Sequence, residues 1–163
     1  MAAVVAASAL PAPGLVPTAR AQANPRRILV VPPLVATAIH DLAFGTVLPG
    51  IPVSISAGDP NHSGLFEISG PATASVRVEF TLPNGLAGSG APLPIAFRPA
   101  DGFDFSHVYP HGMFFDPHGP LVAALGPDGQ LFVRLGGTVL PSRTQSGGSY
   151  SATITMTVYN LGS

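Results

Sequence analysis

Residues 149–159, SYSATITMTVY, alternate between larger, mostly apolar side chains and small hydroxyl-bearing ones. One face would carry Tyr150, Ile154, Met156 and Val158, and the other would carry serine and threonine. Because successive side chains of a strand point to opposite faces, this period of two predicts a strand with one buried face. At this length it is the strongest strand signal in the chain.

The same period occurs in residues 75–82, where Val76 and Val78 share one face and Arg77 and Glu79 share the other. Shorter apolar segments predict further strands at residues 28–31, 35–44, 51–57, 65–69, 93–98, 121–125 and 130–140. The 19 glycines and 19 prolines leave no room for a sustained helical pattern and favour many turns. The sequence therefore predicts an all-β fold, an antiparallel β-sandwich of about seven to nine strands.

Two glycine-containing segments refine this prediction. Gly126-Pro127-Asp128-Gly129 has the residues of a tight turn, which predicts that residues 121–125 and 131–135 form a hairpin. Gly136-Gly137 interrupts the alternation of residues 130–140, as expected of a bulge or a bend. Pro32-Pro33 cannot donate ladder hydrogen bonds, so the first strand should lie at an edge or change sheets there.

Composition excludes several classes of function. Only 9% of the 163 residues are charged, the net charge is -1 and there is no lysine, so nucleic acid is not an expected partner. Cysteine is also absent, which excludes disulfides, thiolate metal sites and thiol nucleophiles. The 46% hydrophobic content favours a folded core over disorder.

Residues 1–23 have the features of a secretion signal. They are rich in alanine and valine and end in Ala21-Gln22-Ala23, the small-x-small pattern of a signal-peptidase site. A basic region at the start is missing, and the alternative is an Ala/Pro-rich cytoplasmic tail. Three prolines and Arg20 argue against a retained membrane span. We expect cleavage after Ala23 and a single mature domain, residues 24–163, secreted to the periplasm or the cell surface.

Four patterns, taken in order, resemble a family of exported bacterial domains of unknown function that is grouped with spore coat protein U and fimbrial subunits. They are residues 33–47 with Asp41-Leu42-Ala43-Phe44-Gly45, residues 66–82, Leu135-Gly136-Gly137-Thr138-Val139, and Gly148-Ser149-Tyr150 with Thr157-Val158-Tyr159. The resemblance implies an immunoglobulin-like sandwich, secretion and a structural role in a coat or appendage, and it implies no catalytic residues.

Residues 101–120 concentrate aromatic and histidine side chains without a clear strand period, which predicts a long loop. This loop either packs over one end of the sandwich or forms a binding surface for a glycan or another cell-surface component. The candidate binding residues are Phe103, Tyr109, Phe114 and Phe115. The candidate metal ligands are His107, His111, Asp116 and His118, although Pro110 and Gly112 oppose the helix that would bring the first two together.

No catalytic motif is present: there is no nucleophile elbow, phosphate loop or metalloprotease motif, and we expect neither an enzyme nor a cofactor. The leading hypothesis is a structural subunit of a surface coat, matrix or pilus-like appendage that assembles with itself through strand or edge contacts. Its candidate assembly strand comprises Ile28, Leu29, Val30 and Val31. The alternative is a monomeric adhesion module that uses residues 101–120.

Overall fold

A computed structural model describes residues 32–107 and 109–162 of the chain, all within one compact unit, Val31–Ser163. These residues contain strands and no helix, and hence no helix that could cross a membrane. The strands are β1 (Val35–His40), β2 (Val53–Ile55), β3 (Gly64–Ser69), β4 (Ser75–Thr81), β5 (Gly85–Leu86), β6 (Leu93–Ala96), β7 (Gly102–Phe105), β8 (Met113–Phe115), β9 (Leu121–Ala124), β10 (Gln130–Leu135), β11 (Gly137–Val139) and β12 (Thr155–Gly162). The predicted leader and the whole of the candidate assembly strand lie outside the described residues.

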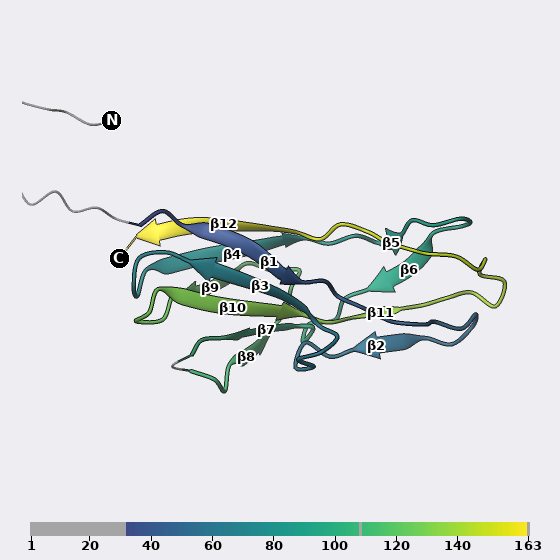
Figure 1. Ribbon diagram of the computed structural model, residues 1–163, viewed down its shortest axis with the longest axis horizontal. Helices are drawn as coiled ribbons and strands as arrows, with labels where there is room; N and C mark the ends of the chain where they lie inside the picture. Colours follow the sequence, from purple (N-terminus) through teal and green to yellow (C-terminus); the bar gives the residue numbers. More distant parts are fainter. Residues whose placement is uncertain (1–31, 108, 163) are drawn as a thin grey trace, which may run out of the picture. The chain divides into compact units, whose positions relative to one another are not determined.

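The twelve strands form three antiparallel sheets (Figure 1). A five-stranded sheet has the order β1-β3-β10-β7-β8, and a three-stranded sheet has the order β12-β4-β9. The third sheet has four short strands in the order β2-β11-β6-β5. The all-β sandwich predicted from the sequence is thus confirmed, with more and shorter strands than expected.

The main core lies between the five-stranded and three-stranded sheets. Alternate residues build it, as the period of two predicts: Val76 and Val78 of β4 are fully buried, and so are Ile68 of β3 and Val133 of β10. Arg77, between the two valines, is exposed. Burying each of these apolar side chains contributes about 1.5–3 kcal/mol relative to leaving it exposed.

Gly136 is the point at which the chain passes from the five-stranded to the four-stranded sheet. Leu135, the last residue of β10, pairs with Gly64 and Gly102, whereas Gly137, the first of β11, pairs with Ile55. A side chain at Gly136 would collide with the backbone of residues 55–57. The predicted break in the alternation is therefore a change of sheet. Only glycine fits at residue 136, because the two backbone segments approach each other closely there.

The predicted hairpin of residues 121–125 and 131–135 is wrong. The turn itself forms, since the Gly129 amide donates to the Gly126 carbonyl at 2.9 Å, but β9 pairs with β4 and β10 pairs with β3 and β7. The turn connects the two facing sheets, and Leu125 and Leu131 on either side of it are both buried in the main core. The residues on either side of the turn are thus buried in the core between two sheets and do not pair with each other as the strands of a hairpin would.

Residues 101–120 also differ from the expected loop, because they contain the antiparallel pair β7 and β8 at one edge of the five-stranded sheet. Phe103 pairs with Phe114 across it. Conversely, the strand predicted from residue 149 begins only at Thr155; before it, Ser151 forms an isolated bridge with Ala87.

Candidate functional site

Strand β1 is the most exposed strand of the five-stranded sheet. All six of its residues are exposed, including Val35 at 46% and Ile39 at 43%. It pairs with β3 on one side only, so the amide and carbonyl groups of its other side have no ladder partner within residues 32–107 and 109–162. Unpaired edges of this kind are templates for pairing with another chain.

Strand β12 is the corresponding edge of the three-stranded sheet, and it lies close to β1 (Figure 1). Its core-facing residues Met156 and Val158 are only half-buried, and Tyr159 and Leu161 are 46% and 53% exposed. On the facing side, Ala36 of β1 is exposed although its register neighbour Ile68 is fully buried, and Ala38 is exposed beside the half-buried Phe66. The sandwich is therefore incompletely closed along this side.

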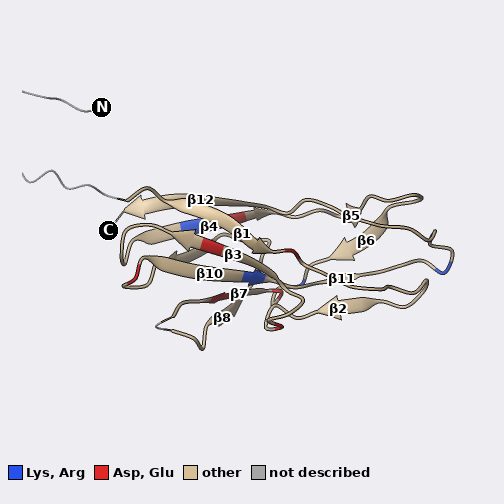
Figure 2. Ribbon diagram, viewed as in Figure 1, with Lys and Arg blue, Asp and Glu red and all other residues tan. Residues whose placement is uncertain are grey.

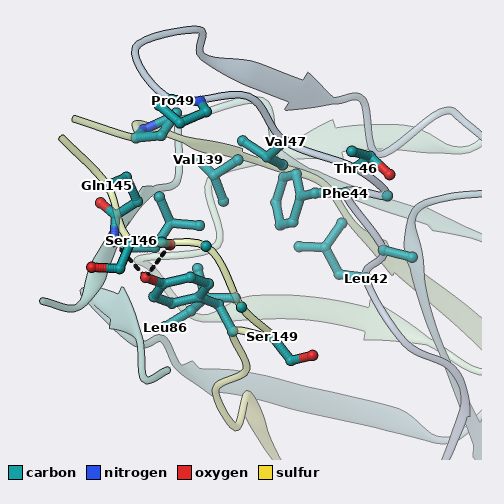
Figure 3. A pocket seen from close by; sticks show the side chains of 17 residues that line it. Leu42, Phe44, Thr46, Val47, Pro49, Leu86, Val139, Gln145, Ser146 and Ser149 are labelled. Carbon is teal, nitrogen blue, oxygen red and sulfur yellow. Dashed lines mark hydrogen bonds between the residues drawn. The ribbon is translucent and has the colours of Figure 1, made fainter. Parts of the chain in front are cut away.

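Two cavities, of about 590 Å³ and 350 Å³, continue along the chain segments that follow β1 and precede β12. They share four lining residues, Leu42, Phe44, Leu86 and Tyr150. We call this hollow the assembly groove; Figure 3 shows the larger cavity, with Leu42 and Phe44 on one wall and Leu86 on another. Three of the shared residues are apolar, and all four pack against the small second core of Leu93, Ile95 and Val139.

The backbone in the irregular parts of the groove walls makes few hydrogen bonds to the other described residues. On the first wall, the Ala43 amide donates to the His62 carbonyl at 2.9 Å. On the second, Ser151 exchanges two hydrogen bonds with Ala87, at 2.8 and 2.9 Å. Residues 44–47 and 152–154 make no hydrogen bond to any other described residue through their backbone. Free backbone donors and acceptors can pair with an added strand.

Tyr150 fixes the second wall. Its hydroxyl donates to the Ser146 carbonyl at 2.7 Å and accepts from the Gln145 side-chain amide at 3.0 Å (Figure 3). The same amide donates to the Ala91 carbonyl at 2.8 Å. These bonds hold the irregular segment before β12 against the β5–β6 connection, so the groove is preformed.

Charge is nearly absent from the groove. Among the lining residues only His40 and Asp41 can carry a charge besides the weakly acidic Tyr150, and both stand at the β1 end of the smaller cavity. Figure 2 shows that the acidic and basic residues on strands belong instead to the faces of β3, β4, β7 and β10. An uncharged, apolar segment would lose the least hydration free energy on entering such a groove.

The candidate binding residues fall into two groups. Phe115 faces the main core and stacks on Phe80 with ring centroids 6.3 Å apart, so it is a packing residue. Phe103 and Phe114 meet on the outer face of the five-stranded sheet, with centroids 4.9 Å apart, and Phe114 is 55% exposed. Tyr109, in the turn between β7 and β8, is 71% exposed.

The outer face contains three more residues that are not among the candidate binding residues, Phe105, Phe132 and Arg134. Phe105 stacks between Phe103 and Phe132, at 5.8 and 5.3 Å, and the guanidinium of Arg134 lies 4.7 Å from the Phe105 ring centre. Phe132 and Arg134 alternate with the buried Leu131, Val133 and Leu135, and this period could have assigned them to the outer face.

The candidate metal ligands are not brought together. His107 pairs with Asp128 at 3.0 Å and His118 pairs with Asp116 at 2.8 Å. No group of three or more potential ligands occurs in the part of the chain that the structure describes. The His107 side-chain hydrogen bond lowers the pKa of Asp128, and the His118 amide, followed by its ring, lowers that of Asp116. These contacts are two separate carboxylate–imidazole pairs: Asp116 and His118 lie within one turn, whereas His107 reaches the turn at residues 126–129.

Comparisons with known proteins add no relative: no protein-family model, no curated protein and no solved structure matches this chain.

Proposed function

We propose that this protein is a secreted, non-catalytic structural subunit of a cell-surface coat, matrix or pilus-like appendage. The observation that carries the proposal is the incompletely closed side of the sandwich, where the edge of β1, which has no ladder partner among residues 32–107 and 109–162, adjoins the apolar assembly groove. The four sequence patterns that resemble coat and fimbrial subunits support the same role, and the signal-like residues 1–23 support export.

The proposed occupant of the groove is the segment Ile28, Leu29, Val30 and Val31 of a neighbouring copy. Four consecutive apolar residues, most of them β-branched, suit an added strand whose main chain pairs with the groove walls and whose alternate side chains fill the cavities. The competing arrangement is that this segment completes its own domain as an edge strand, which would make the protein a monomer.

Light scattering of the mature chain, residues 24–163, over a wide concentration range tests the proposal. We expect concentration-dependent oligomers, and we expect a chain starting at residue 32 to be monomeric yet folded. Phe44→Asp in the groove should also abolish oligomers, because it would desolvate a charge in an apolar cavity. Val122→Asp, at a 63% exposed position of the distant edge strand β9, is the matched control and should leave assembly unchanged.

A peptide of residues 24–34 then identifies the donor. It should bind the chain that starts at residue 32 and should fail to bind the Phe44→Asp form of that chain. A mature chain that remains monomeric at every concentration, or oligomers that survive removal of residues 24–31, would reject the proposed assembly strand.

The second candidate function is a monomeric adhesion module, favoured by the aromatic outer face. Phe103, Phe105, Phe114 and Phe132 form a continuous row there, and Arg134 has a buried Nε atom without a hydrogen-bond partner among the described residues. Replacing Phe114 and Tyr109 by alanine should abolish binding to a glycan array while preserving the fold. Unchanged binding by this double variant would count against the adhesion module.

A further inference from the structure

The turn between β2 and β3 holds an Asp–Pro peptide bond, Asp59–Pro60, whose aspartate carboxylate is held in place by three donors. The Asn61 amide donates to Oδ1 at 2.8 Å, the His62 amide donates to the same oxygen at 3.3 Å, and His62 Nδ1 lies 2.9 Å from Oδ2. The Asn61 amide, followed by the His62 ring, lowers the pKa of Asp59. The carboxylate therefore stays ionised in mild acid.

The main-chain carbonyl of the same residue is also polarised. Its oxygen accepts hydrogen bonds from the Ser63 amide, at 3.3 Å, and from the Ser63 hydroxyl. Ser63 is only 2% exposed, so both donors are fixed and shielded from water. Two fixed donors on one carbonyl oxygen are the arrangement that stabilises the negative charge of a tetrahedral intermediate.

We propose that Asp59–Pro60 is a self-cleavage site, at which the Asp59 carboxylate attacks its own main-chain carbonyl carbon. The side chain has the length to close a five-membered ring on that carbon. The leaving nitrogen belongs to proline, whose ring leaves it without an N–H, and carboxylates are established nucleophiles in covalent catalysis. His62 is the proton donor that the structure places at this carboxylate.

The reaction balances without an oxidant or a metal. A bond forms between a carboxylate oxygen and the Asp59 carbonyl carbon, and the bond from that carbon to the Pro60 nitrogen breaks. The electron pair of the broken bond stays on nitrogen, which takes the proton of the His62 imidazolium. Water then opens the cyclic anhydride to two carboxylates, and the two protons released return to His62 and to the new Pro60 amine.

The chain contains an internal comparison in Asp116–Pro117. Its carboxylate is also hydrogen-bonded by a histidine, through the His118 amide at 3.0 Å and the His118 ring at 2.8 Å. Among the described residues, however, the Asp116 carbonyl accepts a hydrogen bond only from the Gly119 amide, at 3.2 Å, and Pro117 is fully buried. The proposal therefore predicts cleavage at residue 59 and none at residue 116, although both sites have an Asp–Pro bond and a nearby histidine.

Cleavage would break the covalent connection between β2 and β3, but the two fragments would stay associated. β1 stays paired with β3, and β2 stays paired with β11. The two pieces should remain together in native solution and separate only in denaturant, so the products must be measured under denaturing conditions.

The experiment is intact-mass spectrometry of the folded, mature chain after incubation at a pH of about 5, between the ordinary carboxyl and imidazole pKa values. We expect two fragments, one ending at Asp59 and one beginning at Pro60. Asp59→Asn should abolish them, and His62→Gln and Ser63→Ala should each slow their formation about tenfold or more. Asp116→Asn is the matched control and should leave the rate unchanged.

The same chain incubated in urea distinguishes a built site from general acid lability. In urea the rate at residue 59 should fall to that at residue 116, because the Ser63 and His62 contacts are lost. An uncleaved folded chain, equal rates at the two Asp–Pro bonds of the folded chain, or faster cleavage in urea would each overturn the proposal. Circular dichroism of Ser63→Ala verifies that its slower cleavage is not caused by unfolding.

Discussion

The two hydrophobic cores of this protein differ in how completely they are closed. The main core has seven buried residues between two facing sheets, among them Ile68, Val76, Val78 and Val133 without any exposure. The second core has three buried residues and is surrounded by half-buried ones, including Leu42, Phe44 and Tyr150, which line the assembly groove. The main core is closed between two sheets, whereas the second core leaves apolar side chains at the surface of a hollow.

Truncating one large side chain in each core should give the largest difference in the free energy of unfolding. Ile68→Ala should lower the free energy of unfolding by about 2–5 kcal/mol, because it leaves a cavity in closed packing. Phe44→Ala should cost clearly less in the chain that starts at residue 32, since Phe44 borders a hollow that water already reaches. Urea denaturation followed by circular dichroism measures both. Equal losses would show that the second core is as closed as the first.

Replacing an alanine by a larger residue in each region tests whether there is free space beside it. Ala74→Leu, at a position 1% exposed in the main core, should destabilise by about 1–3 kcal/mol through overpacking. Ala38→Leu, on the exposed strand β1 and in the lining of the groove, should change stability by about 0.5 kcal/mol or less. Thermal unfolding of the two variants measures the difference. A large loss from Ala38→Leu would contradict an open groove.

The smallest effect concerns Asp104 of β7, where desolvation by burial raises the pKa of the carboxyl. Because the folded pKa lies above the unfolded one, stability should fall as pH rises from the ordinary carboxyl value of about 4 through the raised value. Asp104→Asn should remove this decline and stabilise the protein at neutral pH by about 1 kcal/mol or less. Unfolding midpoints at pH values of about 3 and 7 measure the effect.

Asp116→Asn is the control of opposite sign. Hydrogen bonds from the His118 amide and ring lower the pKa of Asp116, so its contribution is present at neutral pH and is lost as pH falls through the lowered value. The variant should therefore be slightly destabilised at neutral pH and little changed in acid. A shift of the same sign in both variants would contradict burial as the cause at Asp104.

The assembly groove could be predicted only in part. The apolar residues Leu42 and Phe44 stand out in the sequence as part of a predicted strand. Their role as a groove wall depends on Leu86 and Tyr150, which are distant in the chain and meet them only in the folded protein. In the same way, the Ser63 contacts that distinguish Asp59 from Asp116 depend on how each turn folds.

The class of the fold and the faces of its most regular strands follow from the amino-acid sequence alone. Val76 and Val78 point inward and Arg77 points outward because alternation along a strand is a local property. The glycines at residues 136 and 137 also predict a break in the alternation, but that this break is a change of sheet depends on the backbone of residues 55–57. Strand pairing, too, is settled in the folded protein: the turn at residues 126–129 permits a hairpin, yet β9 and β10 join opposite sheets. Pairing and exposed edges depend on burial between segments far apart in the chain, and no local pattern records that burial.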